Sequence, residues 1–166
     1  MKERFDIVDR NDHVIGQAER SQVHGNPELI HRVIHILVFN SAADWFLQQR
    51  SWNKDTQPGK WDTAVGGHVD TGESYHQAAL REMEEELGIE TAKLTFLYKF
   101  FHTSDFESEM VSTYTCCWNG EIHLNPHEIL TGRFWKLDEI RNRIAEGIFT
   151  PQFLEELKRY QDLTSR

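Results

Sequence analysis

The clearest hydrophobic pattern of the chain is the apolar stretch at residues 30–39, which contains an unbroken series of β-branched and large apolar side chains around one histidine. Such a composition is typical of a central β-strand. Residues 45–50 form a second apolar run, separated from the first by a polar turn at residues 40–44. We therefore expect two neighbouring strands in the middle of a sheet.

Shorter patterns surround this pair. Residues 5–9 and 14–17 flank the polar turn at 10–13 and predict a hairpin. One or two helical turns are expected over residues 18–24, before Gly25 and Pro27 interrupt the chain. Three further strands are expected, the first two antiparallel to each other, over residues 94–101, 110–118 and 134–137. Residues 51–60 contain few apolar side chains and predict a loop of the kind that often carries function.

Helices are indicated by apolar positions that repeat every three or four residues. Over residues 75–87, Ser74 and Gln77 have the spacing of a capping box, and Gly88 supplies a left-handed end. The expected core face of this helix holds Leu80, Met83 and Leu87. Two more helices are predicted, one ended by Gly147 and one capped by Thr150 with proline at its first position, over residues 138–146 and 151–160.

The helix predicted at residues 75–87 also carries an excess of negative charge. Glu82, Glu85 and Glu86 fall within an arc of roughly 100°. Like charges at this spacing destabilise an isolated helix by about 0.2–0.5 kcal/mol per pair. Arg81 can pair with Glu85 but cannot neutralise all three carboxylates. A hard divalent cation such as Mg²⁺, which ordinarily binds together with substrate phosphates, would relieve the repulsion. The alternative is a solvated acidic face.

Composition narrows the class of protein. A chain of 166 residues predicts one domain, over residues 1–166. The net charge of −9 and the absence of a Lys/Arg-rich run argue against a partner that is a nucleic-acid polymer or a membrane surface. No apolar stretch approaches the length of a transmembrane helix or a signal-peptide core, and the adjacent Cys116 and Cys117 cannot link distant segments. We expect a cytoplasmic protein, and a homodimer is left open.

The segment from residue 67 to residue 89 resembles the signature of the Nudix hydrolase family. The matching positions are Gly67, Glu73, Arg81, Glu82, Met83, Glu85, Glu86, Gly88 and Ile89. The resemblance implies an α/β (α+β) fold, an α/β/α sandwich with a mixed sheet between helices, and metal-dependent attack of water on a phosphoanhydride. It also implies that Arg81 and Glu73 brace the loop and helix. The implied metal ligands, one of which can be the water-activating base, are Glu82, Glu85 and Glu86, and with Arg81 they form the expected catalytic set.

A second set of residues resembles the isopentenyl diphosphate isomerases, which are built on the Nudix fold. His24, His31 and His68 have the order and spacing of three metal ligands in that family, and Glu107 and Glu109 match the other two. Alternation along a strand would turn both carboxylates to one face. Such a ligand set suits Mn²⁺, Zn²⁺ or Fe²⁺ better than Mg²⁺. The resemblance also implies that a small-molecule diphosphate substrate is bound by Arg50 and Lys54.

The departures from the isomerase favour hydrolysis. Gly66 occupies the position of the isomerase's catalytic cysteine, and an isomerisation needs an acid and a base on opposite sides of the alkene. Glu82 stands where the isomerase has arginine. We expect a hydrolase of a nucleotide or another diphosphate-containing metabolite, with Mg²⁺ or Mn²⁺ at the helix and a second Mn²⁺ or Zn²⁺ at the His/Glu set, either structural or catalytic. The alternatives are an isomerase with another acid and a non-enzymatic metabolite-sensing domain.

Overall fold

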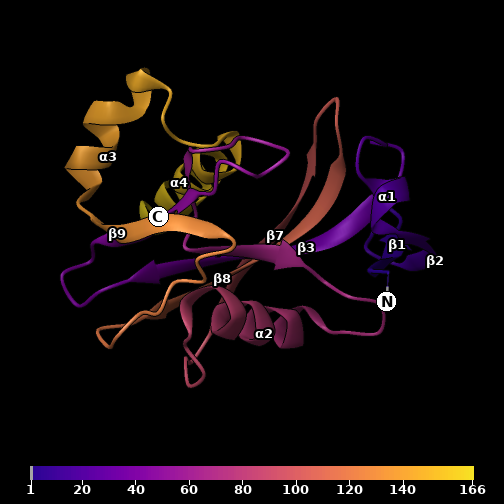
Figure 1. Ribbon diagram of the computed structural model, residues 1–166, viewed down its shortest axis with the longest axis horizontal. Coiled ribbons are helices and arrows are strands. Elements are labelled where there is room, and N and C mark those ends of the chain that lie inside the picture. Colours follow the sequence, from indigo (N-terminus) through magenta and orange to yellow (C-terminus); the bar gives the residue numbers. More distant parts are fainter. Residues whose placement is uncertain (1) are drawn as a thin grey trace.

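The computed structural model describes residues 2–166, in which groups of consecutive strands are separated by helices (Figure 1). Its elements, in order, are β1 (Arg4–Val8), β2 (Val14–Glu19), α1 (Arg20–Val23), β3 (Ile30–Phe39), β4 (Trp45–Arg50), β5 (Trp61–Asp62), β6 (Val65–His68), α2 (Tyr75–Leu87), β7 (Thr95–Thr103), β8 (Ser108–Cys117), β9 (Ile129–Trp135), α3 (Leu137–Arg143), the 3₁₀ helix η1 (Ile144–Glu146) and α4 (Pro151–Thr164).

Strand β3 is the centre of the sheet. It pairs in parallel with β8 along its whole length, from Ile30 opposite Ser108 to Phe39 opposite Cys117, and β7 lies antiparallel on the outer side of β8. The other edge of β3 pairs antiparallel with three strands in turn, namely β1, β6 and β4. Strand β4 in turn pairs antiparallel with β9 and with β5. The sheet is therefore mixed, as predicted.

Helices cover both faces of this sheet. Figure 1 shows α2 on one side, with α3 and α4 on the other. Alternate residues of β3 supply both cores, because successive side chains of a strand point to opposite faces: Ile34 and Ile36 pack in the cluster that holds Met83, whereas Leu37 packs with Phe153. This arrangement confirms the predicted α/β/α sandwich, in which each buried large apolar side chain contributes roughly 1.5–3 kcal/mol.

Helix α2 has the predicted bounds and the predicted ends. Ser74 accepts a hydrogen bond from the Gln77 backbone, the Gln77 side chain returns to the Ser74 backbone, and Gly88 is left-handed. The expected core face was wrong in one residue, since Leu80 is 36% exposed. The buried arc is turned toward Ala79 and Glu86, which leaves Leu80 at its edge and brings Glu86 to the sheet.

Two strand segments that contain glycine were not predicted from the sequence pattern. His68, predicted in a turn, is the last residue of β6 and lies opposite Val33 of β3. Strand β9 begins at Ile129 rather than at the predicted residue 134, because it pairs with β4 as far as Arg50. Gly132 lies in the middle of β9, where a Cβ would come within 2.6 Å of the Phe46 ring.

The two C-terminal helices also differ in length from the prediction. The expected helix at residues 138–146 is divided into α3 and the 3₁₀ helix η1, and the left-handed Gly147 ends it as predicted. Helix α4 extends to Thr164, past the predicted residue 160, and Thr150 caps its first turn by accepting a hydrogen bond from the Phe153 backbone.

Candidate active site

A polar cavity of about 490 Å³ lies between the loop at residues 51–60, strand β6 and helix α2. It is lined by all of the site residues predicted from the sequence except His31: Arg50, Lys54, Arg81, Glu82, Glu85, Glu86, His24, His68, Glu107 and Glu109. His31 is fully buried beside Glu107 and Glu109. The fold therefore brings the carboxylates of α2 and the His/Glu set to one place.

The contact between β6 and α2 depends on Gly67. A Cβ placed on Gly67 would overlap the carboxyl group of Glu82. Gly67 does not have a positive φ, so close approach rather than backbone freedom requires glycine here. Its neighbour Gly66 has no such restriction, since the nearest atom to a Cβ there would be the His35 Cδ2 atom at 3.5 Å.

Arg81 connects the loop that follows β6 to helix α2. Its guanidinium donates two hydrogen bonds to Glu73, at 2.8 and 2.9 Å, and one to the His68 carbonyl at 3.0 Å. It also donates to Glu82 at 2.7 Å and, less closely, to Glu85 at 3.4 Å. Bidentate Arg–carboxylate pairs fix orientation as well as charge. Arg81 thus determines where the Glu82 carboxyl group lies.

The carboxylates of α2 differ in their surroundings. Burial raises the pKa of Glu82 to about 7, against the lowering effect of Arg81. Burial, followed by the charge of Glu82, raises the pKa of Glu86 well above its ordinary value, although Gln48 donates a hydrogen bond to Glu86 at 2.7 Å. The Glu85 side chain remains more than half exposed. Two acidic groups are therefore held in a poorly solvated place, where a bound cation would favour their charged forms.

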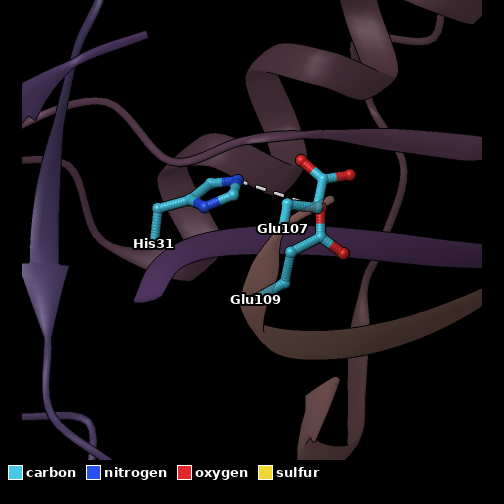
Figure 2. A group of neighbouring side chains, drawn as sticks. All are labelled: His31, Glu107 and Glu109. Atoms are coloured by element: carbon cyan, nitrogen blue, oxygen red, sulfur yellow. Dashed lines mark ion pairs between the residues drawn. The ribbon is translucent and has the colours of Figure 1, made fainter. Parts of the chain in front are cut away.

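The residues of the His/Glu set lie close to one another. Figure 2 shows His31 on its strand facing the carboxyl groups of Glu107 and Glu109, and the ligand atoms of the three lie within 4.8 Å of one another. His31 Nε2 is 3.8 Å from Glu109 Oε1. The rings of His24 and His68 lie 6.5 and 5.3 Å from the His31 ring, measured between centroids.

The unpaired atoms of this set are available to a ligand such as a metal ion. Both ring nitrogens of His31 and Nε2 of His24 are buried without a hydrogen-bond partner among the described residues. Burial lowers the pKa of His31 to about 4, so its imidazole is neutral, which is the form that binds metals. Burial, and then Glu107, raise the pKa of Glu109 to about 7. Unpaired imidazoles beside crowded carboxylates fit a divalent transition metal.

Arg50 and Lys54 line the cavity, but neither is a free cation. Arg50 donates to the Thr56 carbonyl at 3.2 Å and pairs with Asp62 at 3.4 Å. Lys54 pairs with Glu128 at 2.8 Å. Both side chains remain partly exposed, at 23% and 32%. A phosphate group that binds here must therefore compete with these carboxylates for the two cations.

Several cavity residues were missed by the sequence reasoning. They are polar side chains from β3, β4, β5, the segment before β9 and the start of α4: His35, Gln48, Asp62, Glu128 and Gln152. The only signal for His35 and Gln48 was a polar residue inside an apolar strand pattern. No motif marked the others, because long-range contacts bring them to the cavity.

Comparison with known proteins agrees with this site. The NUDIX domain family matches residues 29–157. An uncharacterised Nudix hydrolase of Yersinia pestis is 35% identical over 155 residues, covering 93% of this chain and 84% of that protein. An isopentenyl-diphosphate Delta-isomerase of Photorhabdus laumondii is 29% identical over 158 residues, covering 90% of each chain. A crystal structure of a Deinococcus radiodurans protein superimposes with a TM-score of 0.81 and 29% identity, covering 95% of this chain and 98% of that one.

The chain therefore belongs to the Nudix family, and it is an enzyme of the Nudix hydrolase class, which acts on phosphoanhydrides. Members of this family generally use divalent metal ions and act on small molecules. The described helices include none with the length and apolar character needed to span a membrane.

Proposed function

We propose that this protein hydrolyses a phosphoanhydride bond in a nucleotide or another diphosphate-containing metabolite and that the reaction depends on a divalent metal. The observation that carries the proposal is the placement of the half-buried Glu82 and the buried Glu86, which line one cavity together with Arg50 and Lys54. Carboxylates that face cations across one cavity fit a metal–diphosphate ligand, since each part of the ligand meets its opposite charge.

The residues of α2 have distinct roles in this proposal. Glu82, Glu85 and Glu86 would hold Mg²⁺ or Mn²⁺, which when bound supplies charge stabilisation and lowers the pKa of a water molecule. Arg81 positions Glu82, and Gln48 positions Glu86 by donating to it at 2.7 Å. Arg50 and Lys54 bind the phosphate oxygens.

A carboxylate must also accept the proton of the attacking water. Glu128 lies on the cavity wall and pairs with Lys54, and its charge raises the pKa of both Glu82 and Glu86. When Lys54 turns to a phosphate, Glu128 is released from this ion pair. We assign Glu128 together with the glutamates of α2 to the set from which the base is drawn.

The His/Glu set would hold a second divalent metal, Mn²⁺ or Zn²⁺. Its ligands come from the end of α1, from β3 and β6, and from the start of β8, so a metal there joins four segments. Four of the five ligands, all but His31, also line the polar cavity. His24→Ala separates the two roles: a large loss of thermal stability with unchanged turnover per folded molecule contradicts a catalytic role.

The isomerase alternative has weaker support. The His/Glu set and the likeness to the Photorhabdus laumondii protein favour it. However, Gly66 supplies no acid, and neither Cys116 nor Cys117 is among the residues that line the cavity. Conversion of isopentenyl diphosphate to dimethylallyl diphosphate by the purified protein would establish the alternative.

The test of the proposal is a panel of diphosphates with Mg²⁺ or Mn²⁺, in which released phosphate and pyrophosphate are measured. Glu86→Gln is expected to lose most of the activity, whereas Glu84→Gln, the same change on the exposed side of α2, is expected to retain it. If Glu86→Gln hydrolyses as fast as the parent, the proposed metal chemistry is wrong. Tight binding of one ligand without turnover of any would favour a sensor.

A further inference from the structure

The turn between β7 and β8 carries a partly exposed aromatic side chain to the His/Glu set. Phe106 is 40% exposed and belongs to none of the hydrophobic core clusters that the described residues form. Among the described residues that line the polar cavity, only Val33 and Phe106 have an apolar side chain. The residue after it, Glu107, is a member of the His/Glu set. Core packing therefore does not account for the position of this ring.

The Phe106 ring packs on His24 and Gly25. Its centroid lies 6.0 Å from that of the His24 ring, with 66° between the two planes. This is an edge-to-face arrangement at a separation that aromatic pairs favour. A Cβ placed on Gly25 would lie 3.9 Å from the Phe106 Cε2 atom, in ordinary van der Waals contact. The ring thus supports the short segment that presents His24 to the other ligands.

The turn that carries Phe106 is itself held by hydrogen bonds. Ser104 Oγ accepts from the backbone of Phe106 at 3.2 Å and of Glu107 at 3.1 Å, and the Ser104 backbone donates to the Glu107 carbonyl at 2.9 Å. The Ser108 hydroxyl, at the start of β8, donates to the Pro27 carbonyl at 2.6 Å. Figure 1 shows the end of this hairpin beside α1. The turn is therefore tied to the segment between α1 and β3.

His24 has less support from the sheet than the other two imidazoles of the set. His31 lies within β3 and His68 ends β6, whereas His24 follows α1, a helix of only four residues. The Nε2 atom of His24 is buried and has no hydrogen-bond partner among residues 2–166. Groups around a metal site commonly orient its ligands, and the apolar shell of the site controls the access of solvent. The Phe106 ring is placed to do both for His24.

We propose that Phe106 is a positioning residue of the second metal site, whose ring holds His24 in the ligand set and slows the release of the metal. The inference rests on the proposed function, in which the His/Glu set binds Mn²⁺ or Zn²⁺. One turn then serves the site twice, because Glu107 is a ligand and Phe106 supports a ligand from a distant segment. Without the ring, His24 is freer to turn away, so the metal is bound more weakly.

The test measures the release of Zn²⁺ from the loaded protein to a chromophoric chelator, with excess Mg²⁺ present to occupy the carboxylates of α2. Phe106→Ala is expected to lower the Zn²⁺ affinity and to speed release by about 10–100-fold, the range found when a group that orients a metal ligand is removed. Phe106→Tyr keeps the ring and is expected to remain near the parent. Phe96→Ala removes a phenylalanine of β7 that is 54% exposed and is expected to have no effect.

A double substitution separates support of His24 from a general effect on the fold. In the His24→Ala background, Phe106→Ala is expected to change the Zn²⁺ affinity by less than about twofold, because the ring then has no ligand to hold. An equal loss of affinity in both backgrounds overturns the inference. So does a lower melting temperature of metal-free Phe106→Ala that is accompanied by the parent's Zn²⁺ affinity and release rate.

These measurements distinguish failure of the inference from failure of the proposed hydrolysis. If the parent hydrolyses no diphosphate, but Phe106→Ala releases Zn²⁺ faster and Phe106→Tyr does not, the proposed hydrolysis fails and the inference stands. If the parent hydrolyses diphosphates and Phe106→Ala retains the parent's Zn²⁺ affinity and release rate, the inference is overturned and the hydrolysis stands. A parent that binds no Zn²⁺ in excess Mg²⁺ overturns the inference together with the second metal.

Discussion

Replacement of Gly67 by alanine tests how closely β6 and α2 must approach for the site to form. The added methyl group overlaps the carboxyl group of Glu82, whose side chain is 14% exposed and lines the polar cavity. Glu82 must turn away from β6, which breaks its hydrogen bond with Arg81, or else α2 must shift as a whole. Either movement displaces an expected metal ligand.

The size of the effect follows from the contacts that are lost. A hydrogen bond between charged groups contributes about 1.5–3 kcal/mol, and each 1.36 kcal/mol of transition-state stabilisation is a factor of about ten in rate. We therefore expect Gly67→Ala to lower kcat/KM about 10–100-fold. Overpacking between β6 and α2 is expected to lower the free energy of unfolding by about 1–3 kcal/mol.

The neighbouring glycine provides the control. A Cβ at Gly66 meets no atom closer than 3.5 Å, so Gly66→Ala is expected to keep both the activity and the melting temperature of the parent. Phosphate release with Mg²⁺ and thermal unfolding of the two variants give the comparison. If Gly67→Ala is as active as Gly66→Ala, Glu82 does not need its observed position and the reasoning fails.

Three further predictions concern stability. Asp12 accepts hydrogen bonds from Arg32, Lys99 and Tyr75, and these hold its pKa below the ordinary value despite burial. The contribution of Asp12 to the free energy of unfolding is therefore present at neutral pH and is lost as the pH falls through this lowered pKa. Asp12→Asn should lower the urea-unfolding free energy by about 1–3 kcal/mol at pH 7 and flatten its decline in acid; an unchanged acid profile would contradict this. EDTA should lower the melting temperature of the parent, since a metal at 100 times its Kd contributes about 2.7 kcal/mol, and His24→Ala should respond less; an equal response would place the metal elsewhere. Thr150→Ala should cost about 1 kcal/mol by denaturant unfolding through loss of the α4 cap, and a cost near zero would show that the cap is dispensable.

The elements that could be predicted from the sequence are those with a strong local pattern. The bounds of β3, β4 and α2 agree with the prediction because an apolar run and a capping box each act within a few residues. Strand β6 was missed because Gly66 and Gly67 carry no strand signal, and Leu80 was misplaced because a helical period does not say how the helix turns to bury Glu86.

The residues of the site also fall into those that a local pattern predicts and those that it does not. The carboxylates of α2, singled out by the spacing from Gly67 to Gly88, line one cavity because a single turn and helix hold them. Gln48, Glu128 and Gln152 reach the same cavity from separate strands and loops, and only the packing of the sheet determines that they do. No local pattern records such contacts.

The parallel pairing of β3 with β8 also has a consequence for the order of folding. His31 and Glu109 are 78 positions apart along the chain, and they become neighbours only when these two strands align. Closing so long a segment is slow compared with forming helix α2 or the hairpin of β1 and β2. The His/Glu set is therefore complete only after the central strands have found their register, and the metal that we propose there can meet all of its ligands only in such a chain.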